Sequence, residues 1–234
     1  MPDLRRLLPA LLLCLPLAPA AAEAPGPAQR LTIQAGEAIT PRPFAARYRL
    51  EVEGWPGADV AHRLTREGDH WQSRMDAGIR IAHGNERSRF RVEEDGVRAL
   101  HYASGYTLLG VGNTYRLEAD ALTTLPDRQT ALFSLSRRAL GGDCAAGETC
   151  RIRYLDHKGR EEVLDFRVLG PEPLSLPAGT FEALTVEASE PDEPDRRLVF
   201  RFHPTLPGLL LAVDYHRGGE RRSRLALSEL SLPE

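Results

Sequence analysis

Histidine and carboxylate side chains are the first candidates for chemistry in this chain. Its seven histidines include no H-x-H or H-E-x-x-H pattern of the kind that binds zinc. Asp214 and His216 are two residues apart in a predicted strand and could supply two metal ligands. Both fall on the polar side of that strand, where charged residues are expected in any case, and no third ligand is apparent. We therefore assign no metal site to this pair.

Motifs for nucleophilic or phosphate chemistry are also missing. Ala103-Ser104-Gly105 lacks the leading glycine of a G-x-S-x-G nucleophile elbow. Gly110-Val111-Gly112 begins like a dinucleotide loop, but no third glycine and no helix follow, so a turn is the better interpretation. The acidic segment from Glu190 to Asp195 has two prolines and lacks calcium-loop spacing. The sequence therefore predicts no catalytic residue, no cofactor and no enzyme activity.

Cys144 and Cys150 are expected to form a disulfide, because two nearby cysteines in an exported chain usually pair. A redox-active dithiol would favour a C-x-x-C spacing, and a zinc site would need more ligands than this segment offers. The closed loop is short, so the bond would stabilise the fold by about 2 kcal/mol. We expect it to pin a hairpin-like excursion.

Export is predicted from the first 22 residues. Arg5 and Arg6 precede an apolar run from Leu7 to Leu17, and small residues follow up to Ala22. This is the pattern of a secretory signal peptide cleaved between Ala22 and Glu23. A buried N-terminal helix is the alternative, but the segment has no amphipathic pattern.

The exported product is predicted to be periplasmic. Leu13, rather than a small residue, precedes Cys14, so lipidation at Cys14 is not expected. The arginine pair leaves general and twin-arginine export both open. No later segment is apolar enough to be a membrane helix, so we expect no transmembrane segment after cleavage.

Composition excludes two further classes of protein. The chain has 234 residues, of which 42% are hydrophobic and 27% charged, which is typical of a folded rather than a disordered protein. Lys plus Arg number 30 against 33 Asp plus Glu, giving a net charge of −3. Nucleic-acid binders usually carry a basic excess, so no nucleic-acid partner is expected.

Alternating apolar and charged residues predict a mainly β fold. In Phe44 to Glu53, apolar residues take one parity and charged residues the other, which places them on opposite faces of a strand. Similar segments follow, separated by short turns such as Glu94-Asp95-Gly96. Short connections require antiparallel pairing. We predict a curved antiparallel sheet or half-open β-barrel with one apolar face, comprising a single domain over residues 44–232 after an extended lead-in at residues 23–43.

One segment is expected to be helical. Ala131, Leu132, Leu135 and Ala139 have helical spacing within Asp127 to Leu140. Asp127 can cap the start, and Gly141-Gly142 can end the helix. We expect this helix to pack against the apolar face of the sheet. Four aromatic residues, Trp71, Tyr102, Tyr106 and Tyr115, could line a concave pocket or fill the core.

The second half of the chain resembles the DUF3108 family of exported bacterial proteins. Leu174 to Leu184, with Pro177-Ala178-Gly179-Thr180-Phe181 at its centre, is similar to that family's "tPAGtFetlkv" segment. Further similarity covers about residues 43–230; it takes in Phe44 to Tyr48, Leu125 to Leu135, Phe166 to Gly170, and Leu206-Pro207. The chain departs from the family in having Phe202 and His203 where tryptophan is common, and in its cysteine loop. The resemblance implies an exported, curved antiparallel sheet near the lipoprotein-carrier type, and no catalytic residues.

Three functions remain open at this point. The first is a non-catalytic periplasmic protein that holds an apolar or lipid-like ligand, or a partner, in the concavity of the sheet. The second is an envelope structural or adaptor protein that acts through protein contacts. The third is a hydrolase, which would require histidine and carboxylate side chains that converge in one cleft.

Overall fold

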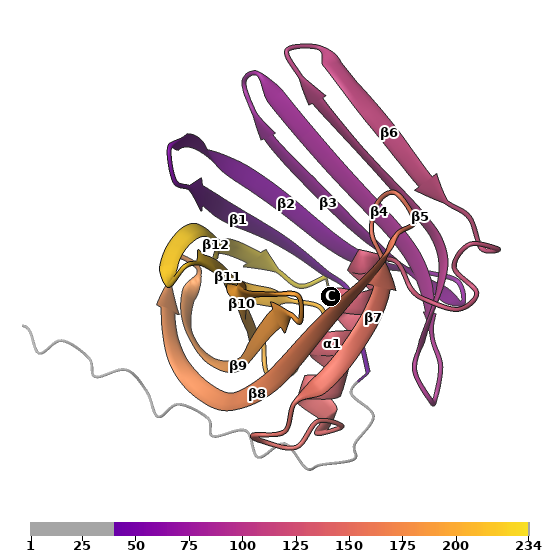
Figure 1. Ribbon diagram of the computed structural model, residues 1–234, viewed down its shortest axis with the longest axis vertical. Coiled ribbons are helices and arrows are strands. Elements are labelled where there is room, and N and C mark those ends of the chain that lie inside the picture. Colours follow the sequence, from indigo (N-terminus) through magenta and orange to yellow (C-terminus); the bar gives the residue numbers. More distant parts are fainter. Residues whose placement is uncertain (1–39, 234) are drawn as a thin grey trace, which may run out of the picture. The chain divides into compact units, whose positions relative to one another are not determined.

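The computed structural model describes residues 40–233, which form a twelve-stranded antiparallel sheet and one helix (Figure 1). This confirms the predicted mainly β class with one short helix. The sheet does not close into a barrel, because its edge strands β6 and β7 do not pair. The elements are β1 (Phe44–Val52), β2 (Trp55–Glu67), β3 (His70–Ile79), β4 (Ala82–Val92), β5 (Val97–Leu108), β6 (Val111–Leu117), α1 (Arg128–Gly141), β7 (Cys150–Leu155), β8 (Glu161–Leu176), β9 (Gly179–Glu190), β10 (Glu193–Phe202), β11 (Leu210–Arg217) and β12 (Glu220–Ser231).

Some predictions fall on other parts of the chain. The predicted signal peptide at residues 1–22, its cleavage site between Ala22 and Glu23, and residues 23–39 of the lead-in lie outside the described residues. Residues 40–43, the described part of that segment, form no helix or strand. No helix between residues 40 and 233 is long and apolar enough to cross a membrane.

The sheet consists of two series of hairpins that meet in its centre. The strand order is β6-β5-β4-β3-β2-β1-β12-β11-β10-β9-β8-β7. We refer to β1–β6 as the N-terminal half-sheet and to β7–β12 as the C-terminal half-sheet. They join where β1 pairs antiparallel with β12. Between β6 and β7 the chain passes through α1, which therefore connects the two edges of the sheet.

The ends of α1 are those that the sequence predicted. The Asp127 carboxylate accepts hydrogen bonds from the backbone N–H groups of Gln129 and Thr130, at 3.0 and 3.1 Å. Gly142 ends the helix in the left-handed conformation, with φ of 77°. The hydroxyls of Ser88 and Thr130 also donate to Asp127, at 2.8 and 2.7 Å. The cap thus ties the start of the helix to β4.

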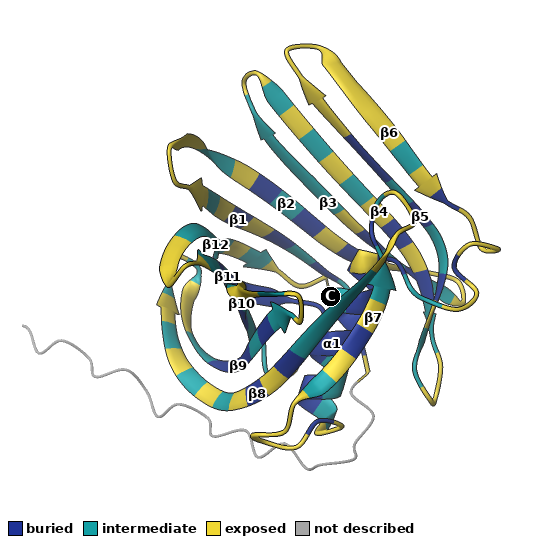
Figure 2. Cartoon of the chain, viewed as in Figure 1, coloured by how far each residue is buried: buried dark blue, intermediate teal, exposed yellow. Residues whose placement is uncertain are grey.

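Phe133 anchors α1 in the core. Its ring centroid lies 4.6 Å from that of Phe90 in β4. Gly208 also approaches the Phe133 ring so closely that a Cβ there would lie 2.6 Å from it. The Gly208 N–H donates to the Ser136 hydroxyl at 3.0 Å. Figure 2 shows buried residues on α1 and on the strands near it, whereas the hairpin ends of β1–β6 are exposed.

The C-terminal half-sheet curls around the helix (Figure 1). Its longest strand, β8, shifts register between Val168 and Gly170, where Gly170 has φ of 107°. Such an irregularity bends a strand and increases its local twist. The bend is the local cause of the curvature that the sequence predicted only in general terms.

Cys144 and Cys150 are joined by a disulfide, with their Cα atoms 6.0 Å apart. The expected hairpin-like excursion is wrong, because Cys144 follows the end of α1 and Cys150 is the first residue of β7. The bond therefore fastens the helix to an edge strand. The Arg138 guanidinium also lies over the Phe166 ring, 5.2 Å from its centroid, and donates to the Arg151 carbonyl at 2.9 Å.

Candidate functional site

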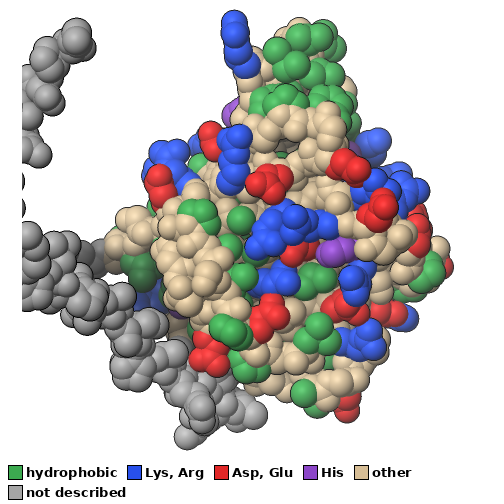
Figure 3. Space-filling model, turned by 90° about the vertical axis from the view of Figure 1, so that its left-hand side faces the viewer, with side chains coloured by type: hydrophobic (Ala, Val, Ile, Leu, Met, Phe, Trp, Pro, Cys, Tyr) green, Lys and Arg blue, Asp and Glu red, His purple; other side chains and the backbone are tan. Residues whose placement is uncertain are grey.

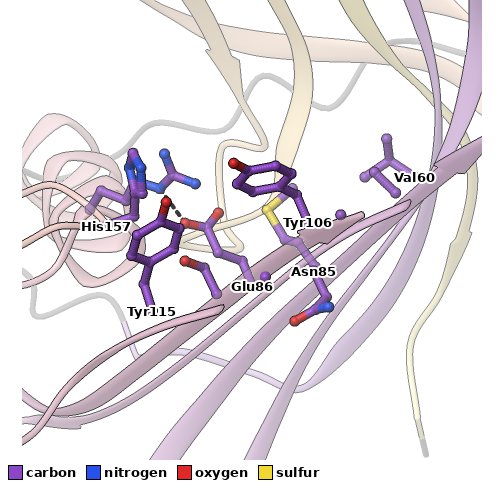
Figure 4. Close-up of a pocket in the computed structure, with 12 residues that line it drawn as sticks. Val60, Asn85, Glu86, Tyr106, Tyr115 and His157 are labelled. Atoms are coloured by element: carbon purple, nitrogen blue, oxygen red, sulfur yellow. Dashed lines mark hydrogen bonds and ion pairs between the residues drawn. The ribbon is translucent and has the colours of Figure 1, made fainter. Parts of the chain in front are cut away.

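A pocket of about 360 Å³ lies on the face of the N-terminal half-sheet that is turned toward α1 (Figure 4). Strands β2 to β6 supply most of its lining, and α1 and the β7–β8 turn each contribute one residue. Figure 4 shows Tyr106 between Val60 on one side and the Tyr115, Glu86 and His157 group on the other. The lining residues are Val60, Met75, Ala77, Gly84, Asn85, Glu86, Ser104, Gly105, Tyr106, Tyr115, Arg128 and His157.

Strand alternation explains why the floor of this pocket is mostly apolar. Val60, Met75 and Ala77 share the parity of buried residues on their own strands, so their side chains turn inward. Gly84 adds no side chain, and its neighbour across the ladder is Tyr106. The space therefore remains open where a larger residue at position 84 would fill it.

The polar end of the pocket is built around Glu86. The Glu86 carboxylate accepts hydrogen bonds from the Tyr102 hydroxyl and the Arg128 guanidinium, and from the Gln129 amide at 3.3 Å. Burial, and secondarily the charge of Glu86, raises the pKa of Tyr102, so its phenol stays protonated. Arg128 balances the Glu86 charge, and this end can orient the polar part of a ligand.

A second cavity of about 200 Å³ adjoins the first. Met75, Glu86 and Arg128 line both, so these side chains form the wall between them. The second cavity runs under α1, where Leu132, Leu135, Ile152, Leu164, Leu198 and Phe200 make it strongly apolar. Ligand sites commonly occupy about 300–1,000 Å³ and combine an apolar lining with a few polar groups. The pocket and its extension fit that description.

The four aromatic residues singled out from the sequence divide between pocket and core. Tyr106 and Tyr115 line the pocket, and the Tyr115 ring meets His157 edge-on with centroids 4.7 Å apart. Trp71 and Tyr102 are buried in the core.

Sequence reasoning missed Glu86, Arg128 and His157. One signal was available for Glu86, because it shares the inward parity of Ser88 and Phe90 on β4. A charge at such a position needs a partner. Arg128 and His157 come from segments that are distant in the sequence from the strands of the pocket. No local sequence pattern predicts that these two residues line it.

A serine–histidine pair does occur, but it does not form a hydrolytic site. His62 Nε2 lies 2.9 Å from the Ser73 hydroxyl, and both residues are buried. Burial lowers the pKa of His62 to about 4, which makes it a weak base at neutral pH. No side chain within the described range hydrogen-bonds to His62 Nδ1, and the adjoining cavity is only about 10 Å³. A substrate could not reach this pair in the described conformation.

The Asp214 and His216 pair lies among arginines. The Asp214 carboxylate is 2.7 Å from the Arg201 guanidinium and 3.7 Å from those of Arg221 and Arg224. Figure 3 looks onto the side of the molecule where charged side chains of both signs crowd together. Three cations around one carboxylate repel a metal ion. Across residues 40–233, no group of three His, Cys, Asp or Glu side chains is placed to hold a metal.

Comparisons with known proteins show a fold that this chain shares with a solved structure, but they show no family. No family model matches the chain, and no curated protein matches it. A beta-barrel-like protein of the domain of unknown function DUF1849, from Brucella abortus, is similar in structure. Its TM-score is 0.51 at 13% identity, over 84% of this chain and 100% of that chain. This likeness shows that the two share a fold.

A more distant likeness is to the MucA/MucB complex of Pseudomonas aeruginosa. Its TM-score is 0.39 at 13% identity, over 82% of this chain and 53% of that chain. This chain therefore spans about half the length of that neighbour, and we base no conclusion on it. The resemblance to DUF3108 stays a prediction.

Proposed function

We propose that this protein is an exported, non-catalytic periplasmic protein that binds an amphipathic, lipid-like ligand in the pocket over β2–β6. The observation that supports this most directly is the pocket itself, whose floor is apolar and whose one polar end is the Glu86–Arg128 group. An acyl or similar chain would lie along Val60, Met75 and Ala77. Its polar group would meet the charged end.

The shape of the pocket supports a narrow ligand. The wall of Met75, Glu86 and Arg128 separates the two cavities, and Met side chains adapt their shape readily. Movement of Met75 would let a chain pass from the first cavity into the second, beneath α1. The ligand would then contact Leu132 and Phe200 as well.

Gly84→Val tests the proposal. An added Cβ at this position has its nearest neighbour, the Gly105 carbonyl oxygen, 3.9 Å away, so the strand tolerates the change while the pocket loses space. We expect mass spectrometry of organic extracts to find a lipid in the purified wild-type protein and about tenfold less in the variant. Binding of a fluorescent fatty acid should weaken in parallel. Gly96→Val, in the β4–β5 turn away from the pocket, is the matched control because no atom lies within 4 Å of its added Cβ.

Two outcomes would count against ligand binding. One is a wild-type protein that carries no lipid and does not bind the probe. The other is equal binding by the Gly84→Val variant. Partner proteins that are captured equally well by wild type and Gly84→Val would then favour the alternative role, an envelope adaptor acting through protein contacts.

A further inference from the structure

Exposed apolar side chains gather at one end of the N-terminal half-sheet. All of the large exposed hydrophobic residues in the described structure lie at or near the β1–β2, β3–β4 and β5–β6 turns, apart from Leu169 and Leu232. These three turns lie along the same side of the sheet (Figure 1). Figure 3 shows hydrophobic side chains at the top of the molecule, where the last of these hairpins ends.

The β3–β4 and β5–β6 ends form one apolar edge, which consists of Ile81, Leu108, Leu109 and Val111. The exposed fractions are 49% for Ile81, 45% for Leu108, 74% for Leu109 and 77% for Val111. The two hairpins are tied together, because the Leu109 N–H donates to the Ile81 carbonyl at 2.8 Å. The apolar edge is therefore one continuous feature rather than scattered single residues.

Charge is scarce around the apolar edge. The segments Ala77–Asn85 and Ser104–Tyr115 contain one residue among Asp, Glu, Lys and Arg, and that residue is Arg80. By contrast, 27% of the whole chain is charged. At the neighbouring β1–β2 end, Trp55 is 62% exposed, and Glu53 there is paired with Arg222. The edge thus offers hydrocarbon, a single positive charge and no acidic group.

Leu109 occupies a strained backbone position. It is the one non-glycine residue with positive φ in the described chain, at 52°. Asparagine or glycine fits this conformation at lower energy, and leucine is disfavoured there. An exposed leucine at such a site costs stability without adding core contacts, which indicates that its side chain serves a purpose outside the fold.

We propose that the apolar edge inserts into the interfacial region of an anionic lipid bilayer. Apolar side chains that project from hairpin ends can enter the headgroup boundary, whereas a stable protein interface needs a face of about 800 Å² per partner. Arg80 complements anionic headgroups, and the edge has no carboxylate to oppose them. The occupant that fits this edge is therefore a membrane surface.

The apolar edge continues into the pocket. Tyr106 lines the pocket and shares its strand face with Leu108, which is paired in register with Val111. Docking would bring Tyr106, and with it this part of the pocket lining, close to the membrane surface. This inference does not depend on the proposed ligand, because vesicle binding is measured separately from ligand content.

Vesicle flotation tests the proposal with Leu109→Asn/Val111→Thr. Asn suits the positive φ, and Thr keeps the branched shape of Val, so the fold is preserved while hydrocarbon is removed. We expect the exported wild-type protein to float with phosphatidylglycerol-containing vesicles and the double variant to bind at least tenfold more weakly. Arg80→Gln should weaken binding about fivefold on anionic vesicles alone. Leu169→Thr, which removes a leucine of β8 that is 58% exposed, is the control and should bind like wild type.

Three results would overturn the proposal. These are absence of wild-type binding to anionic vesicles, equal binding by wild type and the double variant, and equal loss in the Leu169→Thr control. If light scattering instead shows a wild-type dimer that the double variant abolishes, with vesicle binding unchanged, a second copy of the chain is the occupant. A Gly84→Val protein that lacks ligand yet still floats would separate docking from ligand binding.

Discussion

The two half-sheets are built from the same hairpin pattern, but α1 covers them to different extents. Strands β7–β12 curl around α1, and side chains such as Phe166, Phe202 and Leu211 are buried in the core that these strands share with it. Strands β1–β6 meet the helix near one end and extend beyond it, which leaves the pocket and the apolar edge. The turns also differ in composition: the β9–β10 and β7–β8 turns carry charged residues such as Asp192 and Lys158, as does the β4–β5 turn with Glu94, whereas the β5–β6 turn carries Leu109.

Because of this difference, we expect stability and binding to depend on different parts of the sheet. The C-terminal half-sheet, α1 and the inner parts of β1–β4 form the core, and substitutions there should lower the free energy of unfolding. The outer part of the N-terminal half-sheet contributes little to the core. Substitutions in it should affect ligand or membrane binding with small effects on stability.

Phe133→Ala should have the largest effect on stability. It removes the ring that contacts both Phe90 and Gly208, and cavities of this kind cost about 3–5 kcal/mol. Urea unfolding followed by circular dichroism measures the change. A loss below about 1 kcal/mol would mean that α1 does not anchor the two half-sheets.

Acidification should destabilise the N-terminal half-sheet through His62. Its pKa is about 4 in the folded state because of burial, against an ordinary value of 6.5, so the unfolded chain binds the extra proton between these pH values. The free energy of unfolding should therefore fall as pH drops from about 6.5 to 4, by on the order of 3 kcal/mol. Urea unfolding across that range measures the slope.

His62→Gln should flatten this pH dependence. Burial also lowers the pKa of His203, which follows β10, to about 4. The wild-type slope therefore contains a His203 contribution that His62→Gln leaves in place and that His62→Gln/His203→Gln should remove. Equal slopes for wild type and His62→Gln would contradict the assignment.

Removal of the disulfide should have an intermediate effect. Cys144→Ala/Cys150→Ala opens a short loop and should lower the free energy of unfolding by about 2 kcal/mol. Since the bond joins α1 to β7, hydrogen exchange should quicken first in β7. Wild-type protein with its disulfide reduced should match the variant; if it does not, the substitutions act in another way.

Leu109→Asn should give the smallest change in stability, and an increase. Relief of the positive-φ strain should raise the free energy of unfolding by about 1 kcal/mol. The same unfolding assay measures it, with Val111→Thr as a neighbour that has ordinary φ. A decrease would show that the Leu109 side chain supports the fold.

Much of the fold could be predicted from local sequence. Alternation from Phe44 onward predicted the strands, and Asp127 with Gly141-Gly142 predicted the ends of α1, because these signals act over a few residues. The pairing of β1 with β12 could not be predicted in this way, since the partners are far apart in the chain. The site was recovered only in part. Tyr106 and Tyr115 were candidates, whereas Arg128 and His157 reach the pocket through tertiary packing.

The strand order also has a consequence for how the chain folds. The first and last strands, β1 and β12, lie side by side at the centre of the sheet, and the middle of the chain forms its margins. β1 leaves a ribosome or translocase first, and its partner β12 emerges only after nearly all of the rest of the chain. Such long-range closure is slow and leaves unpaired strand edges exposed in the meantime. Loss of β12 would therefore divide the sheet at its centre, whereas loss of an edge strand would leave the rest of the sheet paired.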